Sequence, residues 1–459
     1  MVRGRDAGKD AHSSEAPDTR VLAADLDLFT ERAVNASHRS TKYVEIPTLS
    51  SLRNKELSMV EFDIPPTDNY LDLKRTQLLI KLRLWRRKGA TGALEVFQPA
   101  EGETAPSPCN MPLAAIVERM ELLLGSDRVQ VNPTDSIYGA RTYAQTLMCY
   151  GQDAKESHLQ EAGYVADEFG IDLDSPEQSG YTQRAYMFYN GATVCLRGYL
   201  NCPIMQQSKL LLNQCAMRLV LHLKAAKYCL QYRVADPNDS VVYEIVEAKL
   251  RVCNVQVDPS IQLGHEAALA SGATAKYNVM QPITNHHTIA AGARNFSYQN
   301  LFAGDVPPLL YIFFQSAERF EGSPAMNCFK FEHANVERIT LTANGEVAPA
   351  GIMKFDMEND DYLDGFDSIF TGTGVFNRDV GCRLPRQSFK HGYALFVYDL
   401  SRNGEGACSE IRDTDGVGNV SIDVQFSKPV AAPLTMTVVG YIKTQLQINR
   451  ERQVVKLYR

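Results

Sequence analysis

Two adjacent histidines, His286 and His287, are the first residues whose chemistry suggests a site, because imidazole nitrogens are common metal ligands. The surrounding residues 285–289 have a strand-like composition. Neighbouring side chains of a strand point to opposite faces, so at most one of the two rings could join a given site. No nearby carboxylate has a matching spacing. The pair therefore does not predict a metal centre.

Carboxylates gather between residues 356 and 367, where calcium binding would be the corresponding chemistry. The acidic run consists of Asp356, Glu358, Asp360, Asp361, Asp364 and Asp367. It lacks the calcium-loop order of alternating oxygen ligands, central glycine and terminal glutamate, and the segment Asp413-Thr-Asp415-Gly416 is an equally incomplete match. A solvated acidic loop is the favoured interpretation of both segments, and weak calcium binding is the alternative.

Phosphate binding has two weak signals. Gly372 and Gly374 lack the third glycine and the strand–turn–helix context of a dinucleotide fold, so we expect them to serve backbone conformations with positive φ. The densest basic cluster consists of Arg83, Arg86, Arg87 and Lys88. We expect this cluster to be a solvated strand end, with a nucleic-acid contact as the less favoured alternative.

Motifs for catalysis are missing from the sequence: it contains no nucleophile elbow, no Walker loop and no His-Glu-x-x-His. The ten cysteines are scattered singly, at positions 109, 149, 195, 202, 215, 229, 253, 328, 382 and 408. None forms Cys-x-x-Cys, so reduced buried thiols are favoured over a disulfide framework. The sequence predicts no catalytic, cofactor-binding or metal-binding residue, and a protein that is not an enzyme.

Length and charge restrict the class of protein. A chain of 459 residues exceeds what one hydrophobic core usually serves, so two or three domains are expected. A net charge of -7 argues against a protein that mainly coats nucleic acid. The most concentrated apolar run, 309–314, is long enough for a strand and too short for a membrane span. Residues 1–10 contain no apolar segment, so no secretory signal is expected.

The elements that would hold these residues are mostly short strands. Residues 77–85 alternate strictly, which predicts one face on a core and one mostly in water. Residues 393–400 are apolar on both faces, which predicts a strand at the centre of a sheet. Residues 184–189 also predict a strand, whereas 113–124 are compatible with a helix. Asn344-Gly345 predicts a tight type I′ hairpin turn.

Helical patterns are few. Residues 143–162 predict a helix that Gly151 breaks in two. Residues 260–270 predict a second helix, with Ser260 as its N-cap and Gly272 after its end. No regular alternation of strand and helix suggests a parallel sheet.

The expected fold is therefore all-β with a few short helices: two consecutive eight-stranded jelly-roll β-sandwiches, a double jelly roll, with long loop insertions. The expected organisation comprises a flexible N-terminal arm, a first jelly roll, a linker helix, a second jelly roll and a C-terminal tail. Their ranges are 1–40, 41–258, 259–272, 273–445 and 446–459.

Eight blocks, in order along the chain, carry a family resemblance. They are Tyr70–Leu78, Leu147–Glu156, Val257–Leu269, Asn300–Gly304, Phe329–His333, Phe366–Gly374, His391–Leu400 and Ile448–Arg452. With them the chain resembles the major capsid proteins of Polinton (Maverick) elements and the related adintoviruses, of the double jelly-roll lineage, over roughly residues 41–452. The turn at Leu124–Arg128 and the loop at 86–112 depart from the family pattern, which puts loop-borne surface features in doubt.

The resemblance implies a structural subunit that forms pseudo-hexagonal homotrimeric capsomers and an icosahedral shell. The shell would belong to a double-stranded DNA virus or a virus-like transposable element, so the protein would reside in the virion capsid after synthesis in the host cytoplasm or nucleus. Implied partners are further copies, a single jelly-roll vertex (penton) protein, and internal or minor capsid proteins bound through the termini. Neither sequence-specific nucleic acid nor a membrane span is implied.

Two alternatives remain open at the level of sequence. One is a jelly-roll carbohydrate-binding protein or enzyme that uses loop carboxylates and calcium, since jelly rolls host unrelated functions. The other is a domesticated host copy of the capsid gene.

Overall fold

A computed structural model of the chain describes residues 35–53, 55–89, 92–132, 135–302, 304–376, 379, 381–407 and 417–458. Residues 1–34 of the expected arm, Cys408 and the segment Asp413–Gly416 lie outside the described residues.

The first half of the chain is a sandwich of two antiparallel sheets. One sheet has the order β1 (His38–Pro47), β11 (Ser240–Val257), β3 (Tyr70–Arg87), with β8 (Val194–Tyr199) and β4 (Leu94–Glu95) both paired to β3. The other has the order β2 (Met59–Ile64), β9 (Met217–Leu223), β6 (Val117–Leu124), β7 (Val129–Gln130).

The second half repeats this topology. One sheet has the order β12 (Ala275–Ile289), β22 (Leu434–Ile448), β15 (Leu309–Ser316), β19 (Phe396–Asp399), with β23 (Val454–Tyr458) paired to β22. The other has the order β13 (Asn295–Gln299), β21 (Val420–Phe426), β16 (Val336–Ala343), β17 (Glu346–Val347), with β18 (Met353–Lys354) paired to β16. In both halves the first strand pairs with a long strand near the end of that half, β1 with β11 and β12 with β22. The strand after the longest connection, β8 or β19, pairs at the other side of the same sheet.

Helices lie in the excursions between strands. Between β7 and β8 are α2 (Tyr138–Cys149), α3 (Gln152–Lys155), η1 (His158–Ala162), α4 (Ser179–Met187) and η2 (Tyr189–Gly191). Between β18 and β19 are α9 (Leu363–Thr373) and η3 (Arg386–His391). The others are α1 (Pro112–Ala115), α5 (Pro203–Gln206), α6 (Ala226–Cys229), α7 (Pro259–Ala270) and α8 (Ala317–Glu321). Two short ribbons, β5 (Thr104–Pro108) with β10 (Leu230–Arg233) and β14 (Gly304–Asp305) with β20 (Val417–Gly418), complete the fold.

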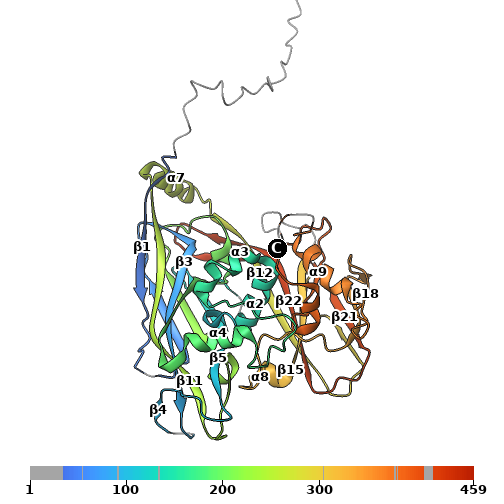
Figure 1. The fold of residues 1–459 in the computed structure, drawn as a ribbon. Coiled ribbons are helices and arrows are strands. Elements are labelled where there is room, and N and C mark those ends of the chain that lie inside the picture. The colour runs from blue at the N-terminus through green and yellow to red at the C-terminus, as the bar shows by residue number, and fades with distance from the viewer. Residues whose placement is uncertain are drawn as a thin grey trace, which may run out of the picture.

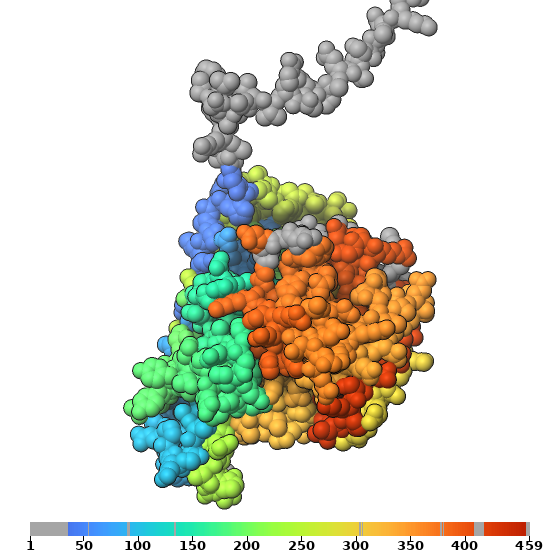
Figure 2. Space-filling view, turned by 45° about the vertical axis from the view of Figure 1, so that its right-hand side comes forward, coloured from blue at the N-terminus to red at the C-terminus, as the bar shows by residue number. Residues whose placement is uncertain are grey.

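The two sandwiches stand side by side, with helices of the first-half excursion between them (Figure 1). Helix α7 lies at one end of the molecule beside β1, and β4 lies at the opposite end. Figure 2 shows the first half, in blue to green, against the second half, in orange, with the first half reaching further at the β4 end. No helix of the described residues is long and apolar enough to cross a membrane.

The apolar alternation of the sequence places the core correctly. Leu78, Ile80, Leu82 and Leu84 of β3 are all at most 3% exposed, and the residues between them are partly exposed. The predicted hairpin is confirmed: β16 and β17 are joined by Asn344 and Gly345, with φ of 55° and 85°. Positive φ at both central residues is what a type I′ turn requires.

The helix predictions are confirmed in part. Gly151 separates α2 from α3, as predicted. The N-cap of α7 is Asp258 and not Ser260, because the Asp258 carboxylate accepts the Ser260 backbone N–H at 2.9 Å. Residues 184–189 were expected as a strand but begin within α4. Most of 113–124 is β6, because its alternate residues face the core.

The segment 361–401 differs most from its prediction. The expected acidic loop is a turn at 356–361 followed by α9. Gly372 lies inside this helix, where a Cβ would be 2.5 Å from Val397 Cγ1. Only Gly374, with φ 71°, ends the helix in the left-handed conformation that was expected of both glycines. The following strand, β19, lies at the edge of its sheet and not at the centre. It is buried because α9 covers that edge, where the Val397 N–H donates to Ser368 Oγ at 3.1 Å.

The segment after Gln445 also differs from expectation. Residues 446–459 are predicted as a C-terminal tail outside the second jelly roll, but β22 continues to Ile448 and β23 pairs with it. Arg452 anchors the turn between them: its guanidinium donates to the Asn213 carbonyl at 2.8 Å and to Glu266 Oε1 at 2.6 Å. The end of the chain is therefore bound to the first half within one molecule.

Candidate functional surfaces and the junction between the two sandwiches

Helix α2 forms the centre of the junction between the two halves. Its Arg141 is 2% exposed and pairs with Asp135, Nε to Oδ2, at 2.9 Å. Asp135 also accepts from Thr284 Oγ1 of β12 at 3.3 Å. The Arg141 guanidinium lies 5.6 Å from the ring centroid of Tyr138, whose pKa burial raises to about 12. Arg141 and Asp135 both belong to the first half, and the hydrogen bond from Thr284 links this buried ion pair to β12 of the second half.

Stacking and a buried lysine extend this junction. Tyr143 of α2 stacks on Phe329 of the second half, with ring centroids 4.7 Å apart and planes 13° apart. The Lys155 ammonium donates to the backbone carbonyl oxygens of Leu147, at 3.2 Å, and Cys382, at 2.6 Å. Burial lowers the pKa of Lys155 to about 8. Carbonyl oxygens from both halves therefore hold one ammonium group.

An ion cluster closes the junction at a third place. Arg319 of the second half is 3% exposed, and its two terminal nitrogens bind the two oxygens of Asp174 of the first half at 2.8 and 3.1 Å. Asp174 also accepts from the Asn327 backbone N–H at 2.7 Å and from Lys330 Nζ at 2.9 Å. Glu332 is a second partner of Arg319, at 3.1 Å. Four hydrogen bonds from the second half thus converge on one carboxylate of the first.

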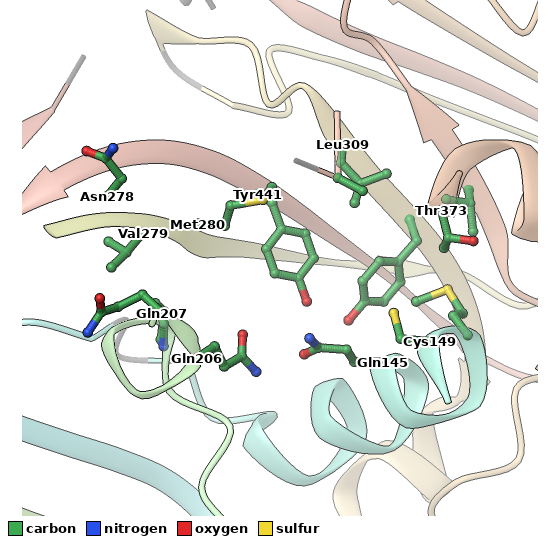
Figure 3. Close-up of a pocket in the computed structure, with 15 residues that line it drawn as sticks. Gln145, Cys149, Gln206, Gln207, Asn278, Val279, Met280, Leu309, Thr373 and Tyr441 are labelled. Carbon is green, nitrogen blue, oxygen red and sulfur yellow. The ribbon is translucent and has the colours of Figure 1, made fainter. Parts of the chain in front are cut away.

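A pocket of about 200 Å³, here called the junction pocket, lies beside α2 and is lined by both halves. The first half contributes Gln145 and Cys149 of α2 and Gln206 of α5, and the second contributes Val279, Tyr311 and Tyr441. Figure 3 shows the hydroxyl end of the Tyr441 ring directed toward Gln145 and Gln206. None of the fifteen lining residues is Asp, Glu, Lys, Arg or His.

The outer face of the sheet β1-β11-β3-β8 is open in the single chain. Here Lys81 pairs with Glu247 at 2.5 Å, and Lys249 pairs with Glu247 at 2.6 Å and with Glu45 at 3.3 Å. Hydrogen bonds from Lys249 and Lys81 lower the pKa of Glu247 to about 2. Tyr199 of β8 is 57% exposed. The equivalent face of the second half, with Tyr311 opposite Val439, is buried against α2.

The two histidines point to opposite sides of β12, as alternation predicted. His286 Nδ1 lies 3.0 Å from Thr437 Oγ1, whereas the His287 ring lies 4.0 Å from the Tyr298 ring. Burial lowers the pKa of both rings. The described residues contain no group of three or more His, Cys, Asp and Glu side chains arranged around a metal.

The acidic run has partners within the chain. Asp356 Oδ1 accepts the backbone N–H groups of Glu358 and Asn359, both at 3.1 Å, and so closes a tight turn. Asp360 pairs with Lys390 at 2.8 Å, and Glu358 pairs with Lys428. Asp364 lies in the first turn of α9, where a carboxylate favours the helix. These carboxylates are dispersed over a turn and a helix and do not converge on a point.

The basic cluster also has intrachain partners. Arg86 binds Glu103 at 2.8 Å and Asp239 at 2.7 Å, which ties β3 to two loops. Arg87 pairs with Glu56, Lys88 with Glu95, and Arg83 Nε donates to Thr193 Oγ1. The cluster therefore stabilises the loops around β4 through ion pairs and hydrogen bonds within the chain. The nine described cysteines form no disulfide; seven are buried, as predicted, whereas Cys149 and Cys195 are exposed.

Sequence reasoning missed the residues that join the two halves. Lys155 and Asp174 stand in polar stretches, and nothing local distinguishes them from solvated residues. Tyr311 and Tyr441 stand in strand-like segments, and their sequence context suggests no function for either side chain. The available signal was a charge within an otherwise apolar helical pattern, as at Arg141.

The order β1-β11-β3-β8 over β2-β9-β6-β7 in the first half recurs as β12-β22-β15-β19 over β13-β21-β16-β17 in the second. These two sandwiches with eight equivalent strands define a double jelly roll. Solved structures share this fold over nearly their whole length. A chain of the Sputnik virophage structure has a TM-score of 0.58 and 12% identity, and the alignment covers 96% of this chain and 92% of that one. The PBCV-1 virus capsid gives 0.57 and 9%, covering 94% and 99%. The mavirus major capsid protein gives 0.53 and 9%, covering 100% and 96%.

Sequence comparison finds a relative with a higher identity. The chain is 21% identical over 365 residues to the uncharacterized protein F54H12.2 of Caenorhabditis elegans, covering 78% of this chain and 83% of that protein. No family model matches the chain.

Proposed function

We propose that this chain is a major capsid protein of the Polinton (Maverick)/adintovirus type. Three copies form a pseudo-hexagonal capsomer, and capsomers assemble an icosahedral shell of a double-stranded DNA virus or virus-like element. Its two jelly rolls lie within residues 38–257 and 275–458. Support comes from the likeness to capsid chains, in which the alignments cover 94–100% of this chain and 92–99% of the others.

The repeated topology of the two halves is the observation that supports a trimer. Within one chain, the first-half excursion covers the β15–β22 face of the second half. The matching β3–β11 face of the first half is open in the single chain. If the same arrangement repeats around an axis, the second half of each copy covers this face on the next copy. Six sandwiches from three chains then close a ring in which every such face is covered.

The trimer is tested by light scattering on the full chain, which should give three times the chain mass of 51.1 kDa. Tyr199→Asp puts an unpaired charge on the open face and should weaken the trimer at least about tenfold, since an unpaired charge in an interface costs several kcal/mol. Val347→Asp, at the half-exposed tip of the β16–β17 hairpin, is the matched control and should leave the trimer intact. A monomeric wild type would refute the capsomer.

Assembly is tested by negative-stain imaging of concentrated protein, where hexagonal trimers or closed shells are the expected result. In the shell, a single jelly-roll protein occupies the fivefold vertices, and internal or minor capsid proteins contact the termini. Co-expression with such a vertex protein should increase the yield of closed particles. Formless aggregates under all conditions would count against a shell.

A domesticated host copy of the gene is the second candidate, favoured by the relative in an animal, Caenorhabditis elegans. The two candidates differ in their genomic neighbours. Genes for a packaging ATPase, a protease and an integrase beside this gene would support an active element, and their absence across independent copies would support a host scaffold.

A further inference from the structure

We propose that the junction pocket binds a small uncharged molecule that carries one hydroxyl or amide group on an apolar body. This goes beyond the capsid function and does not depend on assembly, because both walls of the pocket belong to one chain.

The pocket contains two buried polar groups without a partner. The hydroxyl groups of Tyr311 and Tyr441 are inaccessible to solvent, and no donor or acceptor of the described residues lies within ordinary hydrogen-bond distance of either. Each hydroxyl group interacts electrostatically with the other and with Arg141. Their rings lie 6.2 Å apart, and Tyr311 is 1% exposed. Buried hydroxyl groups almost always have a partner, since an unpaired one is costly. Two such groups on one wall therefore mark a place where a polar atom belongs.

The opposite wall supplies a complementary donor and acceptor. Gln145 Oε1 accepts from Asn201 Nδ2 at 2.9 Å, and Gln206 Nε2 donates to Asn201 Oδ1 at 2.8 Å. The asparagine thus fixes the orientation of both amides. It leaves Gln145 Nε2 as a donor and Gln206 Oε1 as an acceptor for a bound group.

Charge and size define the class of ligand. None of the lining residues is charged, and Arg141, whose charge acts on the two tyrosine hydroxyl groups, is already paired with Asp135. An ionic ligand would therefore have no free counter-charge. Val279, Leu309 and Val397 provide apolar walls for the remainder of the molecule. A cavity of about 150 Å³ holds one benzene ring, so the pocket of about 200 Å³ suits a ring with one or two substituents.

The position of the pocket gives the ligand a consequence. A molecule that contacts α2 and β15 at once binds only when the two sandwiches are docked, so it stabilises that arrangement in proportion to its occupancy. Ligand binding should therefore raise the melting temperature of the whole chain.

The experiment uses 4-fluorophenol as the probe, followed by ¹⁹F NMR on the full chain, with negatively charged 4-fluorobenzoate as the size-matched control. We expect saturable line broadening for the phenol alone, together with a rise in melting temperature. Tyr441→Phe should weaken binding by about tenfold, the effect of losing one hydrogen bond of about 1.4 kcal/mol.

A second variant separates the pocket from adventitious binding. Asn278→Trp places a large ring at the exposed edge of the lining and should abolish binding, whereas Asn295→Trp, at an exposed position of β13, should not. The proposal is overturned if wild type shows no saturable binding, if 4-fluorobenzoate binds equally well, or if Tyr441→Phe and Asn278→Trp both bind like wild type.

Discussion

Replacing Asp174 by asparagine removes the charge on which four hydrogen bonds from the second half converge. The partner, Arg319, is 3% exposed and would keep only Glu332 as an ionic partner. Breaking a buried ion pair from one side costs about 3–5 kcal/mol. The Asp174 side chain is 24% exposed and Glu332 remains, so we expect the low end of this range, about 3 kcal/mol.

Asp172→Asn is the matched control. Asp172 binds Lys330 at 2.6 Å, but its side chain is 58% exposed. An exposed ion pair contributes at most about 1 kcal/mol. The free energy of unfolding should be measured by urea denaturation, followed by fluorescence of Trp85, the single tryptophan of the chain. Equal losses for the two variants would refute the assigned role of Asp174.

The effect of pH gives an independent test of the same group. Burial opposes ionisation of Asp174, but the bonds from Arg319, Asn327 and Lys330 outweigh it and lower the pKa below the ordinary 3.8. A carboxyl group with a lowered pKa in the folded state stabilises the protein fully above its unfolded pKa, and this contribution is lost as pH falls through the folded pKa. The stability difference between wild type and Asp174→Asn should therefore shrink below pH 3.8. A difference that stays constant down to unfolding would contradict the assignment.

Three further substitutions test the segment around β19. Phe396→Ala should lower the free energy of unfolding in urea by about 3–5 kcal/mol, because the ring is fully buried against Phe355 and Phe389. The resulting misfolding should prevent trimer formation. A loss below about 1 kcal/mol would show that the core there is not tightly packed. Gly372→Ala should lower the free energy of unfolding by about 1–3 kcal/mol in the same assay, since the alanine Cβ would lie 2.5 Å from the Val397 side chain. An unchanged urea midpoint would contradict that close approach. Asp364→Asn should change stability by less than about 0.5 kcal/mol with or without calcium, because its carboxylate is exposed, and loss of folded trimer in this variant would reveal a structural ion site.

Local periodicity was enough to predict the class of fold. The alternation in β3 identified its buried face, because a period of two residues is a property of the strand alone. The Asn344-Gly345 turn and the break at Gly151 followed from the conformational preferences of single residues. The order of strands in the two sheets did not follow from periodicity, and the expectation of two jelly rolls needed the strand count and the family resemblance together.

Only tertiary structure decided what the segment 361–374 forms and which residues join the two halves. Its glycines and carboxylates favour a loop locally, but packing against β19 stabilises a helix in which Gly372 permits close approach. The bond between Asp174 and Arg319 joins residues 145 positions apart, and that between Lys155 and Cys382 joins residues 227 apart. Sequence determines which side chains can form such bonds. Which partner each of these side chains meets depends on how the two sandwiches dock. Docking must supply such a partner, because a buried charge is too costly to leave unpaired.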